Sequence, residues 1–213
     1  MSHTLHRRGT PDSLSRDYVV FAMSAKGINA DNSKNALKEF LDIVTQYNWV
    51  NMGDMKTGGY YLVGKDAIME GVQDTSIVHG VFTSKEDVKK AVKALREADL
   101  GVSVTISGIL TEVRDGIGAE GLKPHTVEVS MGIKGRTDRL PEDDLLQITT
   151  MCGHGMVSQT LVRKMLIDIK RGRRTAEEAS QYLATPCVCG VFNPKRAQEI
   201  LEELLDVWCL DED

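Results

Sequence analysis

In the first part of the chain, segments with the apolar pattern of a strand take turns with segments that have the apolar pattern of a helix. A compact apolar run of strand length, Tyr18–Met23, comes first. Residues 31–44 follow, with a capping Asp or Asn and an apolar stripe at helical spacing. The two patterns then return as a strand over residues 76–82 and a helix over residues 84–100. Strands and helices are therefore expected to alternate along the sequence.

The remaining segments of this region are shorter or weaker in pattern. They are a hairpin at residues 49–64, a helix at 65–72, a strand at 102–106, a helix at 109–118 and a strand at 127–131. Helices between strands predict an α/β fold, with α+β as the alternative, in which helices cover a mixed sheet of ferredoxin-like or doubly wound order. Polar alternation in several strands indicates that one face of the sheet is only partly covered.

After residue 134 the pattern changes to helices only. Residues 134–139 are polar and contain glycine, so they mark a boundary. Helix starts are indicated by Pro141, by a capping box at Thr175 and by Asn193, and a long apolar stripe covers residues 157–169. The N-terminal arm is expected to be loose, as chain termini usually are. The chain is accordingly divided into a polar N-terminal arm (1–16), an α/β sandwich domain (17–133) and an all-helical C-terminal region (134–213).

Composition and charge argue against several classes of protein. The chain has 213 residues, of which 41% are hydrophobic and 27% are charged, an ordinary globular balance. Its net charge of -5 gives no electrostatic case for binding nucleic acid or an anionic membrane. No apolar run approaches the roughly 18 residues that a membrane span needs, and the sequence shows no signal peptide. The protein is therefore expected in the cytoplasm, where thiols stay reduced and clustered cysteines indicate metal or redox chemistry.

Three of the four cysteines fall in two short loops that are rich in small residues. Cys152 lies in segment 149–155, and Cys187 and Cys189 lie in segment 185–190. Both segments precede predicted helices, where free N–H groups and the helix dipole lower a thiol pKa and favour the thiolate. Because one helical hairpin separates the two loops, we expect them to meet and to hold a thiolate-ligated metal centre.

An iron–sulfur cluster is the first choice for this centre, with zinc as the alternative. Neither the paired CxxC motifs of structural zinc sites nor the CxxCxxC run of ferredoxins is present. The predicted metal ligands are Cys152, Cys187 and Cys189, and His154 is a fourth ligand or a catalytic proton donor. Glycine lets the backbone approach such a centre closely. The glycines predicted to line the cofactor site are Gly153, Gly155 and Gly190.

Three functions are consistent with these residues. The leading hypothesis is a cytoplasmic iron–sulfur protein, an oxidoreductase or a lyase, that performs redox or Lewis-acid chemistry on a small molecule or exchanges electrons with a partner. The second is a metal-free thiol enzyme with Cys152 as nucleophile and Cys187 and Cys189 as a redox pair. The third is a non-catalytic interaction module, with zinc or no metal. Ser-His-Asp, HExxH and nucleotide-binding motifs are absent.

Other polar residues fit structural roles better than functional ones. Cys209 is expected to pack among apolar neighbours, and His79 and His125 to be ordinary strand residues. Asp54 and Lys56 are weaker candidates for contacting a substrate from the hairpin. A basic cluster at the end of the long helix is expected to be solvated, and it comprises Lys164, Lys170, Arg171, Arg173 and Arg174.

Overall fold

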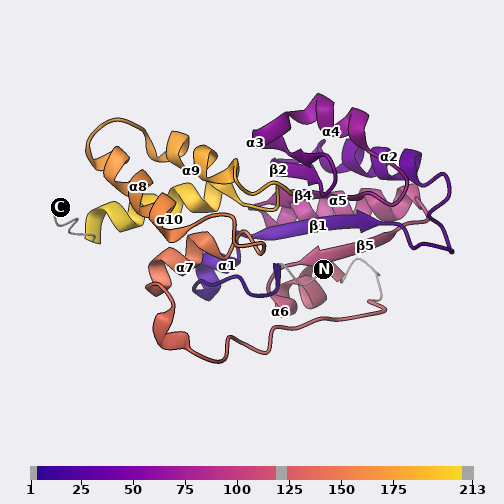
Figure 1. Cartoon of the computed structure of the whole chain (residues 1–213). Helices are drawn as coiled ribbons and strands as arrows, with labels where there is room; N and C mark the ends of the chain where they lie inside the picture. The colour runs from indigo at the N-terminus through magenta and orange to yellow at the C-terminus, as the bar shows by residue number, and fades with distance from the viewer. Residues whose placement is uncertain (1–3, 119–123, 208–213) are drawn as a thin grey trace.

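The computed structural model describes residues 4–118 and 124–207, and its centre is a five-stranded sheet (Figure 1). The strand order is β3-β2-β4-β1-β5, and every pair of neighbouring strands is antiparallel. The strands are β1 (Tyr18–Met23), β2 (Trp49–Asp54), β3 (Gly58–Gly59), β4 (Ile77–Phe82) and β5 (Ser103–Ser107).

Two split β-α-β units explain this order. Helix α2 (Lys34–Val44) connects β1 to β2, and helix α5 (Lys85–Ala98) connects β4 to β5. In each unit the two connected strands leave room for one strand of the other unit between them. The resulting β-α-β-β-α-β connectivity is the ferredoxin-like arrangement. The predicted α/β class is confirmed. The sheet is antiparallel rather than mixed. The two strands joined by each helix are not neighbours, and the strand that lies between them runs antiparallel to both.

Strand β1 is buried on both faces because helices cover each of them. Tyr18, Val20 and Ala22 belong to one hydrophobic core, together with residues of α2 and α5. Helix α5 begins as its sequence predicts, since the Ser84 hydroxyl accepts a hydrogen bond from the Asp87 N–H at 3.2 Å.

The C-terminal helices contribute to a second core. Val19 and Phe21 point to the other side of β1 and pack with residues of these helices and of the loops between them. Sheet and helices thus share a core, and whether residues 17–133 and 134–213 fold independently stays a prediction. The helices are α7 (Asp143–Thr149), α8 (Gln159–Lys170), α9 (Ala176–Ala184) and α10 (Pro194–Val207), and they gather beyond the start of β1 in Figure 1.

The remaining elements are all short. The predicted hairpin has only Gly58–Gly59 as its second strand, because the apolar run after it forms a helical turn instead. The helix predicted at residues 65–72 is confirmed, and the one predicted at 109–118 continues as a π-helical turn that buries Ile117. These elements are α1 (Pro11–Leu14), α3 (Tyr60–Val63), α4 (Lys65–Gly71), α6 (Leu110–Glu112), the π-helical η2 (Val113–Ile117) and the 3-10 turn η4 (Thr137–Arg139).

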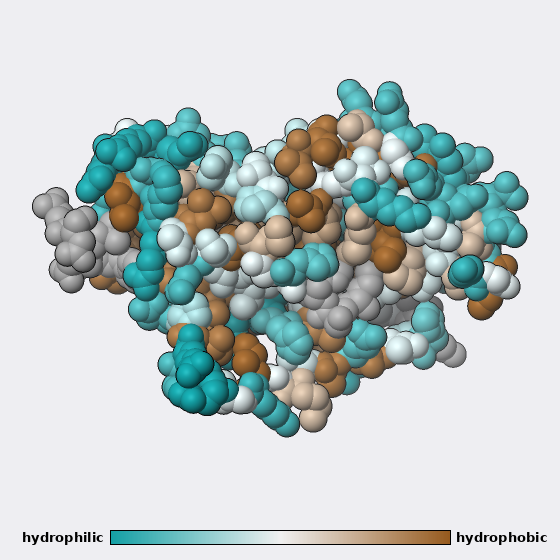
Figure 2. Space-filling view, viewed as in Figure 1, coloured by the Kyte–Doolittle hydropathy of each residue, from teal (hydrophilic) through white to brown (hydrophobic). Residues whose placement is uncertain are grey.

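The strand predicted at residues 127–131 is wrong. The segment contains no strand, and its apolar side chains face solvent, with Val127 56% and Met131 77% exposed. Alternation alone does not make a strand, since a ladder also needs a neighbouring edge at the right distance. The segment instead runs along the lower edge of the molecule from the sheet towards α7, where Figure 2 shows brown apolar residues among hydrophilic ones (Figures 1 and 2).

Candidate functional site

The two cysteine loops meet in space. Loop 1 (residues 150–158) joins α7 to α8, and loop 2 (residues 185–193) joins α9 to α10. The Cys189 Sγ lies 3.9 Å from the Cys187 Sγ and 3.6 Å from the His154 Nδ1 of the other loop. The three cysteines are at most 2% exposed, whereas His154 is exposed. The expectation that the loops meet is confirmed, and the catalytic and ligand roles of their residues stay predictions.

Loop 1 does not place Cys152 at a helix start, contrary to the sequence-based expectation. Helix α8 begins only at Gln159, with the Ser158 hydroxyl as its cap. Gly155 instead adopts a left-handed conformation, with φ of +68°, and turns the chain before the helix. In loop 2, Asn193 caps α10 as predicted, because its side-chain oxygen accepts a hydrogen bond from the Arg196 N–H at 3.0 Å. The helix dipole is therefore not the main influence on Cys152.

Hydrogen bonds lower the pKa values of two of the three thiols. The pKa of Cys152 is lowered to about 6, chiefly by a hydrogen bond from Cys187, and burial opposes this change. Backbone N–H groups of Met156, His154 and Val157 add to the lowering. The pKa of Cys189 is also lowered to about 6, again chiefly by Cys187, with help from the Val191 N–H. Both shifts favour the thiolate form of these two sulfurs.

Cys187 has the opposite tendency. Its hydrogen bonds to the sulfurs of Cys152 and Cys189 raise its pKa, and burial raises it further. Three negative sulfurs in contact would repel one another strongly in a buried site. The arrangement therefore favours a protonated Cys187 between its two neighbours, and a cation is another species that could neutralise the three sulfurs.

The glycines of the loops have different surroundings. Gly190, with φ of +80°, presses against the sheet, so a Cβ there would lie 2.6 Å from the Met52 carbonyl oxygen and 2.7 Å from the Gly59 Cα. A Cβ on Gly53 would likewise lie 2.2 Å from the Cys189 carbonyl oxygen. Gly153 and Gly155 are exposed instead. The N–H groups that reach sulfur belong to other residues of the loops and not to these glycines. Gly190 therefore chiefly permits a close backbone approach.

A cavity of about 650 Å³ opens beside Cys152 and His154. Its walls come from loop 1, from α7 and from the N-terminal arm. Polar groups of Thr149, Thr150 and Gln159 face it together with His6. A small molecule in this cavity would lie beside Cys152 and His154.

The other candidates from the sequence lie elsewhere. His79 is buried in β4 against Phe21, with ring centroids 5.4 Å apart, and His125 is exposed. Asp54 is buried and accepts hydrogen bonds from the Lys56 N–H and from the hydroxyls of Thr57 and Ser76, which is a structural role.

The two remaining expectations concern the basic cluster and the last cysteine. In the basic cluster, the exposed side chains of Lys164 and Arg173 form ion pairs with Asp168 of α8, which is buried. Cys209 lies outside the described residues.

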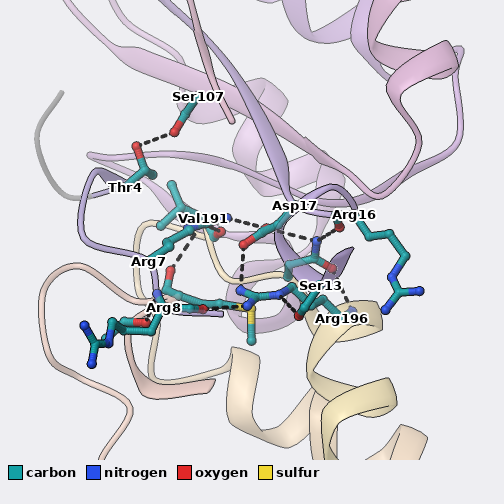
Figure 3. A network of polar contacts seen from close by, with 12 residues as sticks. Thr4, Arg7, Arg8, Ser13, Arg16, Asp17, Ser107, Val191 and Arg196 are labelled. Carbon is teal, nitrogen blue, oxygen red and sulfur yellow. Dashed lines mark hydrogen bonds and ion pairs between the residues drawn. The ribbon is translucent and has the colours of Figure 1, made fainter. Parts of the chain in front are cut away.

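Sequence reasoning missed the N-terminal arm. The described part of the arm, residues 4–16, is not loose, because its arginines bind both cysteine loops and the start of β1 (Figure 3). Buried Arg196 of α10 and buried Asp17 complete this network. A pair of arginines in a polar terminus carries no local pattern, so only the three-dimensional contacts reveal it.

Comparisons with known proteins identify no relative. No protein-family model, curated protein or solved structure matches the chain. Within residues 4–118 and 124–207, no group of three or more His, Cys, Asp or Glu side chains is arranged so that it could hold a metal ion. In the same part of the chain, no helix is long and apolar enough to cross a membrane.

Proposed function

We propose that Cys152, Cys187 and Cys189 bind a metal and that His154 is its fourth ligand at rest. A small molecule in the adjacent cavity would reach the metal by displacing His154, and the metal would supply Lewis-acid chemistry if it is zinc and redox chemistry if it is an iron–sulfur cluster. The observation that carries the proposal is the convergence of loop 1 and loop 2 on Cys189. A cytoplasmic location, in which the thiols stay reduced, is part of the same proposal.

The separations between the side chains favour a single metal atom. Zinc lies about 2.3 Å from a thiolate sulfur and about 2.0–2.1 Å from an imidazole nitrogen. In a tetrahedron with those bond lengths, two sulfurs are about 3.8 Å apart and a sulfur and a nitrogen about 3.6 Å apart. Two of the six separations in such a site match these values, at 3.9 Å between the sulfurs of Cys187 and Cys189 and 3.6 Å between the Cys189 sulfur and the His154 Nδ1. Zinc in a Cys3His site is therefore the metal that we favour.

Metal binding would replace the shared proton. The four side chains do not yet surround one point, and hydrogen bonds link Cys187 to both neighbouring sulfurs. A divalent cation would take the place of that proton and neutralise the thiolates. His154, exposed at the edge of the cavity, is then the fourth ligand at rest and, once displaced, a proton donor to the substrate.

An iron–sulfur cluster is the second candidate for the centre. Backbone N–H groups of His154, Met156, Val157 and Val191 reach the sulfurs of Cys152 and Cys189. Such N–H donors to sulfur stabilise reduced clusters and set their potentials. A substrate or an electron-transfer partner would then meet the cluster from the cavity side.

A metal-free thiol enzyme remains a distinct alternative. Cys152 borders the cavity and has a pKa of about 6, which suits a nucleophile at neutral pH. In that case Cys187 and Cys189 form a redox pair, and purified protein contains no metal at all.

Elemental analysis and visible absorption of protein purified under anaerobic conditions distinguish these candidates. We expect about one zinc per chain and no colour; a broad brown absorption with iron indicates the cluster. Cys187→Ser should abolish retention of either metal, because one thiolate ligand is lost. Wild-type protein without metal, and unable to take up zinc or iron, would refute the proposed centre.

Metal affinity should also depend on pH in a stepwise manner. Above about pH 6 the thiols of Cys152 and Cys189 are already ionised, so binding releases mainly the Cys187 proton. Below that pH, protons also compete at Cys152 and Cys189, and affinity should fall more steeply with each pH unit. Competition with a chromophoric chelator between pH 5 and 8 measures this slope. An affinity that does not change with pH would contradict thiolate ligation.

A further inference from the structure

Arg7 of the N-terminal arm lies between the two cysteine loops and contacts the backbone of both (Figure 3). Its Nη2 donates to the Met151 carbonyl oxygen at 3.3 Å and to the Val191 carbonyl oxygen at 2.5 Å. Its side chain is only 6% exposed. One planar guanidinium therefore connects loop 1 to loop 2.

The contacts of Asp17 hold Arg7 in this position. The Asp17 carboxylate is fully buried and forms an ion pair with the Arg7 Nη1. It also accepts hydrogen bonds from the Arg196 Nη1 at 2.9 Å and from the Asn193 Nδ2 at 3.1 Å. Because Asp17 immediately precedes β1, and Asn193 and Arg196 lie at the start of α10, the sheet and the last helix together orient Arg7.

The two carbonyls that Arg7 holds lie next to the thiolates. Met151 directly precedes Cys152 in the chain. Val191 lies two residues after Cys189, and its N–H group donates to the Cys189 sulfur. A shift of either peptide would change the distance between loops and the hydrogen bonds to sulfur. The Nη2 group donates to both carbonyls while Nη1 of the same rigid guanidinium pairs with Asp17, a combination that a single ammonium reproduces less well.

We propose that Arg7 is a positioning residue that clamps the two cysteine loops together, so that the N-terminal arm must be in place for the centre to form. Its effect on metal binding rests on the proposed function. Its effect on the loops does not, because the contacts join protein groups alone. The neighbouring Arg8 supports the arm through its backbone, with its N–H donating to the Thr150 hydroxyl at 2.9 Å.

Arg7→Met tests the clamp, since methionine keeps much of the apolar volume and removes the fork. Asp17 retains Arg196 and Asn193 as partners in this variant. We expect zinc affinity to fall by about tenfold or more, the usual loss when a group that orients metal ligands is removed. In zinc-free protein, we expect iodoacetamide to modify Cys152 and Cys189 faster than in wild type, as followed by peptide mass spectrometry.

Two variants serve as matched controls. Arg8→Ala removes a neighbouring arginine whose side chain is 40% exposed and pairs with Asp143, and it should behave as wild type. Leu37→Ala removes a buried side chain of the core on the other side of the sheet, so it lowers stability without touching the loops. Comparison at temperatures equally far below each variant's Tm separates positioning from general destabilisation.

The outcomes separate the clamp from the metal proposal. Arg7→Met with lower zinc affinity and faster alkylation than both controls supports the clamp. Values equal to those of Arg8→Ala, or to those of Leu37→Ala at matched stability, would overturn it. If wild type binds no metal, the proposed centre fails while the alkylation rates still test the clamp. Should Arg7→Met not fold, Arg7→Lys, which retains a charge for Asp17, is expected to show smaller changes in the same direction.

Discussion

Gly190→Ala is expected to destabilise the protein and to lift loop 2 from the sheet. A side chain at this left-handed position costs about 1–2 kcal/mol, and forcing extra volume against neighbours costs roughly 1–3 kcal/mol more. The neighbours are the Met52 carbonyl and the Gly59 Cα, both backbone atoms that cannot rotate away. Denaturant unfolding should therefore show a loss of roughly 2–5 kcal/mol, and metal retention should fall with it.

Gly155→Ala is the matched control for this change. Gly155 has a similar φ of +68°, but a Cβ there would have no neighbour within 4 Å. It should cost only the strain of the left-handed conformation, about 1–2 kcal/mol. Equal losses in the two variants would show that close approach between loop 2 and the sheet does not matter.

Asp17→Ala is expected to have a comparably large effect on stability. Asp17 and Arg196 are fully buried, and Arg7 is nearly so. Removing the carboxylate leaves two buried guanidinium groups without their acidic partner, and breaking a buried pair in this way costs roughly 3–5 kcal/mol. Thermal and denaturant unfolding measure the loss, and cysteine alkylation should rise because Arg7 is no longer held.

Asp143→Ala provides the comparison for that variant. Asp143 pairs with Arg8, but the two side chains are 77% and 40% exposed. Exposed pairs of this kind contribute about 0–1 kcal/mol. A loss for Asp17→Ala no larger than that for Asp143→Ala would contradict a structural role for the buried network.

Local patterns in the sequence predict the elements whose signals are complete within a few residues. The apolar run Tyr18–Met23 is confirmed as strand β1. The Ser84 cap and the Thr175 capping box are confirmed as well, since the partner of each lies three residues further along the chain. Alternation at residues 127–131 failed because a strand also needs an edge from elsewhere in the fold. The strand order could not be read for the same reason, as it depends on contacts between distant segments.

The candidate site divides in a similar way. The clustering of cysteines and small residues predicted the positions of both loops, and the loops are in contact through Cys189 and His154. The assumption that Gly155 opens a helix misplaced Cys152, because a glycine can equally turn the chain. The roles of Arg7 and Arg196 could not be predicted, because the sequence does not distinguish a buried arginine from a solvated one. Only the acceptors that the fold brings to each guanidinium do so.

X-ray absorption at the edge of the metal that wild-type protein retains shows whether the two loops bind one metal atom. We predict a shell of three sulfurs at about 2.3 Å and one nitrogen at about 2.0–2.1 Å, without a second metal atom nearby. Substituting Cys187 by Ser should remove the sulfur signal together with the metal. A shell of oxygen ligands, a short metal–metal distance, or an unchanged spectrum in Cys187→Ser would contradict the claim.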